Sequence, residues 1–364
     1  LPLLQQLSFE TRRPRSRSPR TLILAPTREL AAQIGDSLET YGRFLHLTHT
    51  VIFGGVSQFH QVKAMHRGVD VLVATPGRLL DLMNQGHVQL QDVQFFVLDE
   101  VDRMLDMGFI PDIEKVLAKL PAERQTLFYS ATMNTKMEKL ARTMVTNPVR
   151  VAIEPETLAV ERIDQTVLFV GQKNKNKLLL TLWDQPGMDK VIIFTQMKHQ
   201  ANRVAEKLEQ SGIKAVAIHG NKSQGARTKA LDGFKCGRYK VLVATDVAAR
   251  GLDVEDITHV VNYDLPMEAE TYVHRIGRTG RAGMAGHSIS FCSAEDRSLL
   301  REIEKLLGKP VPAEKDHPFH CNESCHSSLP ASKNFGRRRN GGPGASSRGR
   351  RSNNRFNHHK RRTR

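Results

Sequence analysis

The run Phe95-Phe96-Val97-Leu98-Asp99-Glu100-Val101-Asp102 decides the fold. Four apolar residues lead directly into three carboxylates, and a continuous apolar run is typical of a parallel strand buried on both faces. Asp99 and Glu100 would then stand at the carboxyl end of that strand, where open α/β sheets bind ligands. There an Asp can hold Mg²⁺ on phosphates and a Glu can orient a water, although the octet alone fits a solvated acidic turn equally well.

Similar apolar runs recur on both sides of this octet, each followed by a helical pattern. In the first half they span 21–25, 50–53, 71–74, 95–99, 126–129 and 149–153; in the second half 165–170, 190–195, 215–218, 241–244, 258–262 and 288–291. Such alternation predicts an α/β fold in which mostly parallel sheets carry helices on both faces. The string VLVAT occurs at 71–75 and again at 241–245, which favours two related halves.

The expected organisation is a first domain over 1–153, a linker over 154–162 and a second domain over 163–308. The remaining residues, 309–364, read as a basic low-complexity tail. The chain carries a net charge of +16, but residues 331–364 hold twelve Lys and Arg and no acid, so only +4 remains for the first 330 residues. A tail of this composition cannot bury enough apolar surface to fold, and its natural partners are phosphate backbones.

The composition of the chain indicates in which cellular compartment we expect the protein. No apolar stretch approaches the 18 or so residues of a membrane-spanning helix. The four cysteines show no framework spacing across the domains, which suits a reducing compartment and predicts a cytoplasmic location. Among them, Cys321 and Cys325 lie beside three histidines (His317, His320 and His326), and the sequence leaves open whether this cluster binds a metal.

Short polar loops follow the expected strands of the first half: Pro26-Thr27-Arg28-Glu29, Gly54-Gly55 and Thr75-Pro76-Gly77-Arg78. Glycines allow close approach to the backbone, helix N-termini attract anions, and Arg can bind phosphate through two nitrogens. Each loop alone is more often a simple capped turn, whereas together on one sheet edge they predict a track for a sugar-phosphate backbone. The hydroxyls of Ser130-Ala131-Thr132 are placed to bond Asp102 if their strands are neighbours.

The second half offers a strongly cationic segment, His274-Arg275-Ile276-Gly277-Arg278-Thr279-Gly280-Arg281. Three arginines without an acid among them are costly to hold together unless anions neutralise them. Arg278 and Arg281, three positions apart, are expected on one helical turn and pointing the same way. Such a pair suits the stabilisation of charge on a phosphoryl group.

These segments, in this order, resemble the motifs of DEAD-box RNA helicases. They are PTREL (26–30), GG (54–55), TPGR (75–78), DEVD (99–102), SAT (130–132), HGNKSQGAR (219–227), ATDVAARGLD (244–253) and HRIGRTGR (274–281). The similarity runs from about Leu1 to Gly308, and the bacterial RhlE-like subgroup looks most similar. The resemblance implies two RecA-like domains that bind ATP and Mg²⁺ between them and clamp single-stranded RNA across both.

The resemblance also implies roles for individual residues. Asp99 would hold Mg²⁺, Glu100 would position the water, and Arg278 and Arg281 would act as arginine fingers. ATP binding and its coupling to RNA would involve Asp102, Ser130, Thr132, Gly251, Asp253 and His274. The implied RNA contacts are Pro26, Thr27, Arg28, Gly54, Gly55, Thr75, Gly77, Arg78, Gln196, Arg227, Thr245 and Asp246. Because these loops offer mainly backbone contacts, we expect weak sequence preference.

Two departures from the family pattern matter. Val101 stands where the family name has Ala; a β-branched residue suits a strand end, so we expect it to be accommodated. The string G-x-x-x-x-G-K-[ST] is absent, and Leu1–Leu7 resembles the helix that follows that loop, so we expect an N-terminally truncated helicase that lacks ATPase activity on its own. The alternative is an ATP-independent RNA-binding or annealing protein that naturally lacks the loop.

Overall fold

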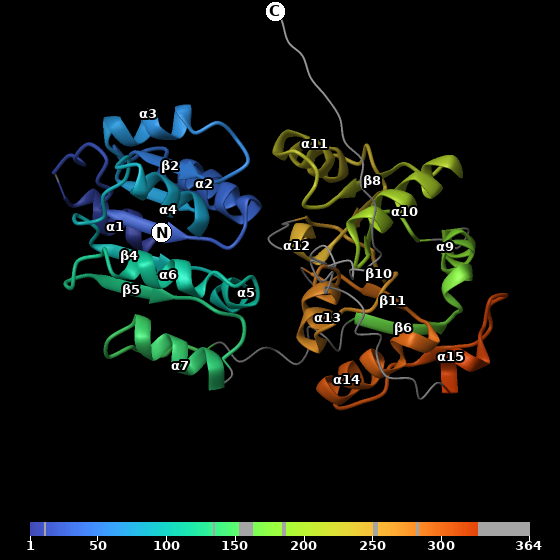
Figure 1. Ribbon diagram of the computed structural model, residues 1–364. Coiled ribbons are helices and arrows are strands. Elements are labelled where there is room, and N and C mark those ends of the chain that lie inside the picture. Colours follow the sequence, from blue (N-terminus) through green and yellow to red (C-terminus); the bar gives the residue numbers. More distant parts are fainter. Residues whose placement is uncertain are drawn as a thin grey trace, which may run out of the picture.

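The computed structural model describes residues 1–10, 12–133, 135–152, 163–183, 187–249, 254–281 and 284–326. These residues form two α/β domains that lie side by side (Figure 1). Among them no helix is both long and apolar enough to span a bilayer. The expected linker, 154–162, and residues 327–364 of the expected tail lie outside the described residues.

The first domain is built on a parallel sheet of five described strands in the order β2-β3-β1-β4-β5. The strands are β1 (Thr21–Leu24), β2 (His49–Ile52), β3 (Val71–Ala74), β4 (Phe95–Leu98) and β5 (Gln125–Phe128). Every residue of β1 and β3 is buried, as a continuous apolar run in a sheet covered on both faces requires. The predicted strand-helix alternation is confirmed, and the strand limits agree to within one residue.

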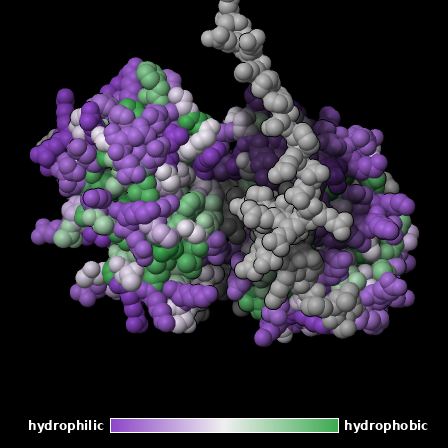
Figure 2. Space-filling view, in the orientation of Figure 1, coloured by the Kyte–Doolittle hydropathy of each residue, from purple (hydrophilic) through white to green (hydrophobic). Residues whose placement is uncertain are grey.

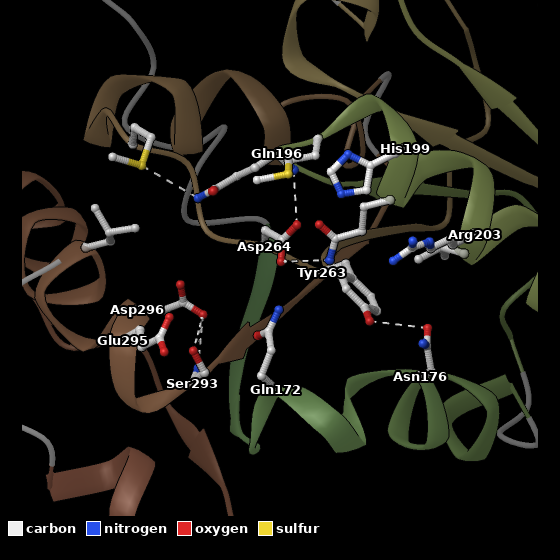
Figure 3. Close-up of a pocket in the computed structure, with 15 residues that line it drawn as sticks. Gln172, Asn176, Gln196, His199, Arg203, Tyr263, Asp264, Ser293, Glu295 and Asp296 are labelled. Atoms are coloured by element: carbon white, nitrogen blue, oxygen red, sulfur yellow. Dashed lines mark hydrogen bonds between the residues drawn. The ribbon is translucent and has the colours of Figure 1, made fainter. Parts of the chain in front are cut away.

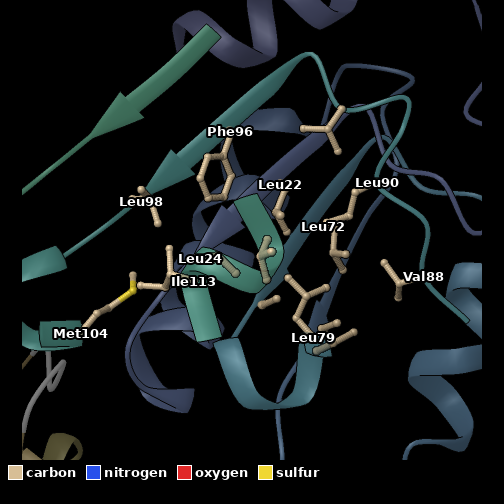
Figure 4. Close-up of a cluster of buried hydrophobic side chains, with 14 of the residues drawn as sticks. Leu22, Leu24, Leu72, Leu79, Val88, Leu90, Phe96, Leu98, Met104 and Ile113 are labelled. Atoms are coloured by element: carbon tan, nitrogen blue, oxygen red, sulfur yellow. The ribbon is translucent and has the colours of Figure 1, made fainter. Parts of the chain in front are cut away.

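Helices cover both faces of this sheet (Figure 1). They are α1 (Pro2–Ser8), α2 (Arg28–Gly42), α3 (Phe59–Arg67), α4 (Pro76–Asn84), α5 (Val101–Asp106), α6 (Ile110–Leu117) and α7 (Thr135–Met144). The larger core cluster joins the sheet to α3 to α7 and includes Leu22, Leu72, Phe96 and Met104 (Figure 4). A smaller one joins the other face to α1 and α2, with Leu7 fully buried. Two apolar layers therefore bury the sheet from both faces, with β1 at its centre and β4 beside it.

One predicted strand of the first domain is wrong over its described part. Residues 149–152 form no strand, and Val149 and Val151 are 89% and 84% exposed. Their alternation fits a strand, but β5 is the last strand on that side and none of the described residues pairs with its outer edge. Apolar side chains consequently gather on the surface over β5 and α7 (Figure 2).

The second domain contains a parallel sheet of seven described strands in the order β12-β6-β11-β10-β7-β9-β8. The strands are β6 (Ile163–Phe169), β7 (Val191–Phe194), β8 (Ala215–Ile218), β9 (Val241–Ala244), β10 (His259–Asn262), β11 (Gly286–Cys292) and β12 (Ala313–Glu314). The two VLVA runs, β3 and β9, occupy matching buried positions next to the strands β1 and β7. This placement agrees with the expected duplication of the fold.

Helices also cover both faces of the second sheet. They are α9 (Lys175–Trp183), α10 (Lys198–Gln210), α11 (Gln224–Lys235), α12 (Asp246–Ala249), α13 (Ala269–Ile276), α14 (Arg297–Leu307) and α15 (Asn322–His326), with short 3₁₀ turns η1 (Gln172–Asn174) and η2 (Ala294–Asp296). The helices α9 and α10 pack on one face, and α11 to α14 on the other. The domain extends past the predicted boundary at residue 308, because β12 pairs with β6 and the backbone N–H of Cys321 donates to Phe169 O.

Candidate functional site

The acidic corner of the first domain lies where β4 ends. The backbone N–H of Asp99 donates to Leu24 O at 3.0 Å, which extends the pairing with β1 by one residue. Burial raises the pKa of Asp99, and the backbone N–H of Glu100 partly offsets this rise. Glu100 adopts a left-handed conformation (φ 51°) that starts α5 and turns the chain away from the sheet. Both carboxylates therefore stand at the expected carboxyl edge.

Glu100 has a partner that the sequence did not suggest. The Arg103 Nη1 group donates to both carboxylate oxygens of Glu100, at 2.8 and 2.7 Å. Burial raises the pKa of Glu100, and Arg103 counteracts this as a nearby positive charge. In this conformation both oxygens of the Glu100 carboxylate are engaged by Arg103.

Asp102 joins the acidic corner to the loop after β5. It is 7% exposed, and its Oδ2 accepts hydrogen bonds from the backbone N–H and Oγ1 of Thr132, at 3.2 and 3.3 Å. The predicted contact between Asp102 and the Ser130–Thr132 loop is thus confirmed for Thr132. Ser130 instead donates its hydroxyl to the carbonyl of Thr132.

Val101, the departure from the family name, is accommodated for a reason other than the expected one. It is the first residue of α5 and not the end of a strand. Its side chain is fully buried in the larger core cluster of the first domain. The extra methyl groups therefore fill the space between the sheet and α5.

The arginines of the second domain do not act alike. Arg275, on α13, is 2% exposed and donates to Asp246 through Nε and Nη2, at 2.6 and 2.8 Å. Its Nη1 donates to Asn262 Oδ1 and to the backbone carbonyl of Asp264. One of the three cationic charges is therefore neutralised inside the domain, and the Asp246 carboxylate is committed to it.

Arg278 and Arg281 do not share a helical turn, so that expectation is wrong. The helix α13 ends at Ile276, a turn follows, and Gly280 takes a positive φ of 68°. Arg281 donates through Nε to the carbonyl of Gly277 at 2.9 Å. The turn that follows Ile276 therefore interrupts the helical spacing between the two arginines.

Arg278 faces the first domain. A small crevice between the domains is lined by Arg103 of the first domain and by His274, Arg275 and Arg278 of the second. The charge of Arg278 lowers the pKa of Glu100, which burial has raised. The acidic corner and one cationic residue thus meet across the interface, as a site divided between two domains requires.

The predicted RNA contacts of the first domain gather at one edge of its sheet. Thr27 caps α2, because its Oγ1 accepts a hydrogen bond from the backbone N–H of Leu30. At the start of α4, the backbone carbonyl of Thr75 accepts a hydrogen bond from the backbone N–H of Leu79. Gly55 has φ +79°, and a Cβ there would overlap the guanidinium of Arg28. Arg78 donates to Gln61 Oε1 and to the carbonyl of Val56. Pro26, Gly54 and Gly77 complete this set of loops, on which helix N-termini and arginines converge.

Two of the predicted contacts meet across the domain interface. Arg227, on α11, donates through Nη2 to Glu29 Oε1 at 2.9 Å, and Gln224 Nε2 donates to the same oxygen at 3.1 Å. Arg28 Nη1 donates to Gln224 Oε1 at 3.3 Å. We call these four residues the interdomain clasp. Burial and the neighbouring charge of Arg227 lower the pKa of Arg28, so this arginine cluster is suited to receive an anion.

The remaining predicted residues are dispersed. Gln196 follows β7 and donates through Nε2 to Leu265 O at 2.7 Å. Thr245 follows β9 and precedes α12. Gly251 and Asp253 lie outside the described residues.

The donor set of the acidic corner fits Mg²⁺. Asp99 offers carboxylate oxygens, which this ion prefers, and a cation would offset the burial that raises the pKa of Asp99. Asp99 would hold the ion, and the ion would neutralise charge on a bound phosphate. The string G-x-x-x-x-G-K-[ST] is absent from the 364 residues, so the structure offers no such loop for the phosphates. Around Cys321, as elsewhere among the described residues, no group of three or more suitable metal ligands comes together.

Two family models match the chain. "DEAD/DEAH box helicase" covers residues 1–140, and "Helicase conserved C-terminal domain" covers residues 174–283. "ATP-dependent RNA helicase RhlB" of Pseudomonas putida is 44% identical over 299 residues, which are 81% of this chain and 75% of that protein. "DEAD-box ATP-dependent RNA helicase 30" of Arabidopsis thaliana is 42% identical over 94% of this chain, which spans only 59% of the plant protein.

Solved structures agree in fold. S. cerevisiae Dbp5 bound to RNA and ADP BeF3 gives a TM-score of 0.71 at 34% identity, over 82% of this chain and 78% of that one. The helicase Mss116 bound to ssRNA and UDP-BeF gives 0.76 at 28% identity, over 87% and 68%. The two parallel-sheet domains define the tandem RecA-like class of helicases. Within that class, the chain belongs to the DEAD-box ATP-dependent RNA helicase family.

Sequence reasoning missed Arg103, Glu29, Gln224 and Arg275 as site residues. Glu29 and Gln224 lay within quoted motifs, but 195 positions separate them in the chain. Arg103 lies three residues after Glu100, the spacing of a helical ion pair, which was the available signal.

Proposed function

We propose that the protein acts as an RNA-stimulated ATPase that clamps single-stranded RNA across both domains and locally separates RNA duplexes. The observation that carries this proposal is the divided site: Asp99 and Glu100 belong to the first domain, and Arg278 of the second domain lines the crevice against Arg103 and lowers the pKa of Glu100 by its charge. Neither domain holds both the carboxylates and the arginine, so only a closed arrangement of the two domains would assemble the complete site for ATP hydrolysis.

The RNA is expected to lie on the edge loops of the first domain and to continue toward Arg227, Gln196 and Thr245. Support comes from helix N-termini and arginines at that edge, and from relatives whose structures are described as bound to RNA. Backbone-directed contacts predict weak preference among sequences. The basic residues after 330 are proposed to add non-specific contacts to RNA or ribonucleoprotein.

Finer assignments are also proposals. The short basic tail supports a bacterial RhlE-like subgroup, and the absence of a cysteine framework supports a cytoplasmic location. Because a phosphate loop is missing from the 364 residues, we expect these residues alone to bind RNA and to hydrolyse ATP weakly or not at all.

The test measures RNA-stimulated ATP hydrolysis and duplex separation, on these 364 residues and on any longer product of the same gene. In a product that carries the loop, Arg278→Ala should reduce the turnover rate by about 10³-fold or more, while single-stranded RNA binding changes little. Undiminished turnover in Arg278→Ala combined with Arg281→Ala would contradict the divided site. Duplex annealing that needs no ATP in any product would favour the ATP-independent alternative.

A further inference from the structure

An open pocket lies in the second domain, outside the divided site. Its volume is about 390 Å³, within the range of small-molecule sites. It is formed by segments that follow four strands of the sheet: Gln172 and Asn176 after β6, the first turns of α10 after β7, Tyr263 and Asp264 after β10, and η2 after β11. The pocket therefore occupies the carboxyl edge of the second sheet.

The topology makes this edge a natural binding position. The connection after β7 leads to β8 on one side, and the connection after β10 leads to β11 on the other, although β7 and β10 are adjacent. Open α/β sheets bind ligands where neighbouring connections diverge in this way. In the first domain, β1 and β4 diverge likewise, and there Asp99 follows β4.

The floor of the pocket is rigid and internally satisfied. The Lys175 Nζ is buried and donates to Asp264 Oδ1 at 3.2 Å and to Asp296 Oδ2 at 3.1 Å. Asp264 Oδ2 accepts from the backbone N–H of Gln196. Burial raises the pKa of Tyr263 to about 12, so its hydroxyl stays protonated and donates to Asn176 Oδ1. These groups shape the cavity, and because two carboxylates share one ammonium the floor keeps one net negative charge.

The charged side chains that a ligand could contact lie on the walls of the pocket. Arg203 and His199 lie one turn apart on α10, and neither makes a hydrogen bond or ion pair within the part of the chain that the structure describes. Glu295 on η2 is also without such a partner among the described residues. Figure 3 shows Arg203 and His199 on one side of the pocket and Glu295 with Asp296 on the opposite side. The pocket is thus basic at one end and acidic at the other.

A ligand that fits must be anionic at one end and rich in N–H donors at the other. We propose that this pocket binds a nucleotide, with its phosphate on Arg203 and His199 and the N–H groups of its base on Glu295. Arg and protonated His donate charge-assisted hydrogen bonds to phosphate, and a carboxylate accepts the imino and amino hydrogens of guanine. The ligand is either a free nucleotide or a nucleotide of bound RNA, because Gln196 of the predicted RNA track also lines the pocket.

Calorimetric titration of the 364-residue protein with guanosine monophosphate tests the proposal. Arg203→Gln should weaken binding about tenfold or more, and guanosine, which lacks the phosphate, should bind both proteins alike. Glu295→Gln should weaken both ligands. Arg238→Gln, an exposed arginine on the turn before β9, is the matched control, and Glu100→Gln separates this pocket from the acidic corner; neither should change the affinity.

No binding at millimolar nucleotide, or equal affinity in the protein and in Arg203→Gln, would overturn the proposal. Thermal melting of each variant verifies that it is folded. A single-stranded RNA oligomer then identifies the source of the nucleotide. If RNA supplies it, Arg203→Gln weakens oligomer binding by a similar factor and guanosine monophosphate competes with the oligomer; if the ligand is free, oligomer binding is unaffected by either.

Discussion

At the scale of single residues, the most consequential contact is the one between Arg275 and Asp246. The sequence suggested three arginines awaiting external anions, and Asp246 as an RNA contact. The structure instead pairs the buried Arg275 with Asp246 through two hydrogen bonds. A buried arginine whose partner is removed keeps its charge, because a guanidinium does not deprotonate in proteins, and so its desolvation goes uncompensated.

Asp246→Asn should therefore destabilise the second domain, because it preserves the shape of Asp246 and removes its charge. We expect a loss of about 2–3 kcal/mol in the free energy of unfolding, somewhat below the range for fully buried pairs since Asp246 is partly exposed. Urea denaturation measures it, with the exposed Asp232→Asn as the control. Unchanged stability in Asp246→Asn, combined with weaker RNA binding, would return Asp246 to the role of a direct RNA contact.

At the scale of elements, continuous apolar runs identified the buried strands well. Runs such as Val71–Ala74 and Val241–Ala244 were placed correctly. A strand covered on both faces has apolar residues at every position, which makes it easy to recognise in the sequence. The same reasoning failed at 149–152, where alternating valines lie exposed and unpaired, because periodicity alone does not tell whether a neighbouring strand exists. It also missed β12 and α15, which depend on tertiary pairing with β6 more than on local composition.

The pairing of β10 with β11 makes a testable pH-dependent element. His259 and His287 lie side by side in register, their rings stacked at 4.8 Å, and His287 also approaches Asp164 of β6 at 3.6 Å. Burial, together with the neighbouring His287, lowers the pKa of His259 to about 4, against a partly compensating effect of Asp189. A histidine whose pKa is lower in the folded state than in the unfolded state is protonated more readily when the protein unfolds. Its contribution to the stability of the folded state is therefore fully present above its unfolded pKa, near 6.5, and is lost as the pH falls toward 4.

We therefore expect His259→Asn to make the free energy of unfolding depend less on pH between about 6.5 and 4. Between pH 7 and pH 4.5 the parent protein should lose roughly 1 kcal/mol more than the variant, a figure reduced because the ring is partly exposed. Denaturation midpoints at several pH values measure the difference, and the exposed His60→Asn is the control. Parallel profiles for the parent protein and His259→Asn would show that the stacked pair does not titrate as the structure implies.

At the scale of the whole molecule, the domains are joined by polar contacts that no stretch of sequence could disclose. The motifs predicted which loops matter, but not that Glu29 of one domain would accept hydrogen bonds from Gln224 and Arg227 of the other. The ion pair is nearly buried, with side chains 9% and 6% exposed. An RNA phosphate at this edge would meet Arg28 and Arg227 while both are engaged in the interdomain clasp, so RNA binding and domain closure should influence each other.

The clasp predicts that closure depends on the charge pair between Glu29 and Arg227. Arg227→Gln leaves a nearly buried carboxylate without its cation, which should disfavour the closed arrangement by about 2–3 kcal/mol, or roughly 30- to 150-fold in its population. The exchange Glu29→Arg with Arg227→Glu restores opposite charges and should recover most of the closure, whereas each single change should not. Interdomain distance distributions from two fluorescent labels, one per domain, measure the populations without RNA. Asp112→Asn, which removes the partner of Lys115 in an ion pair within α6, provides the control. Closure that survives Arg227→Gln, or that the double exchange fails to restore, would show that other contacts hold the domains together. The expected coupling between RNA binding and domain closure through the interdomain clasp would then lose its basis.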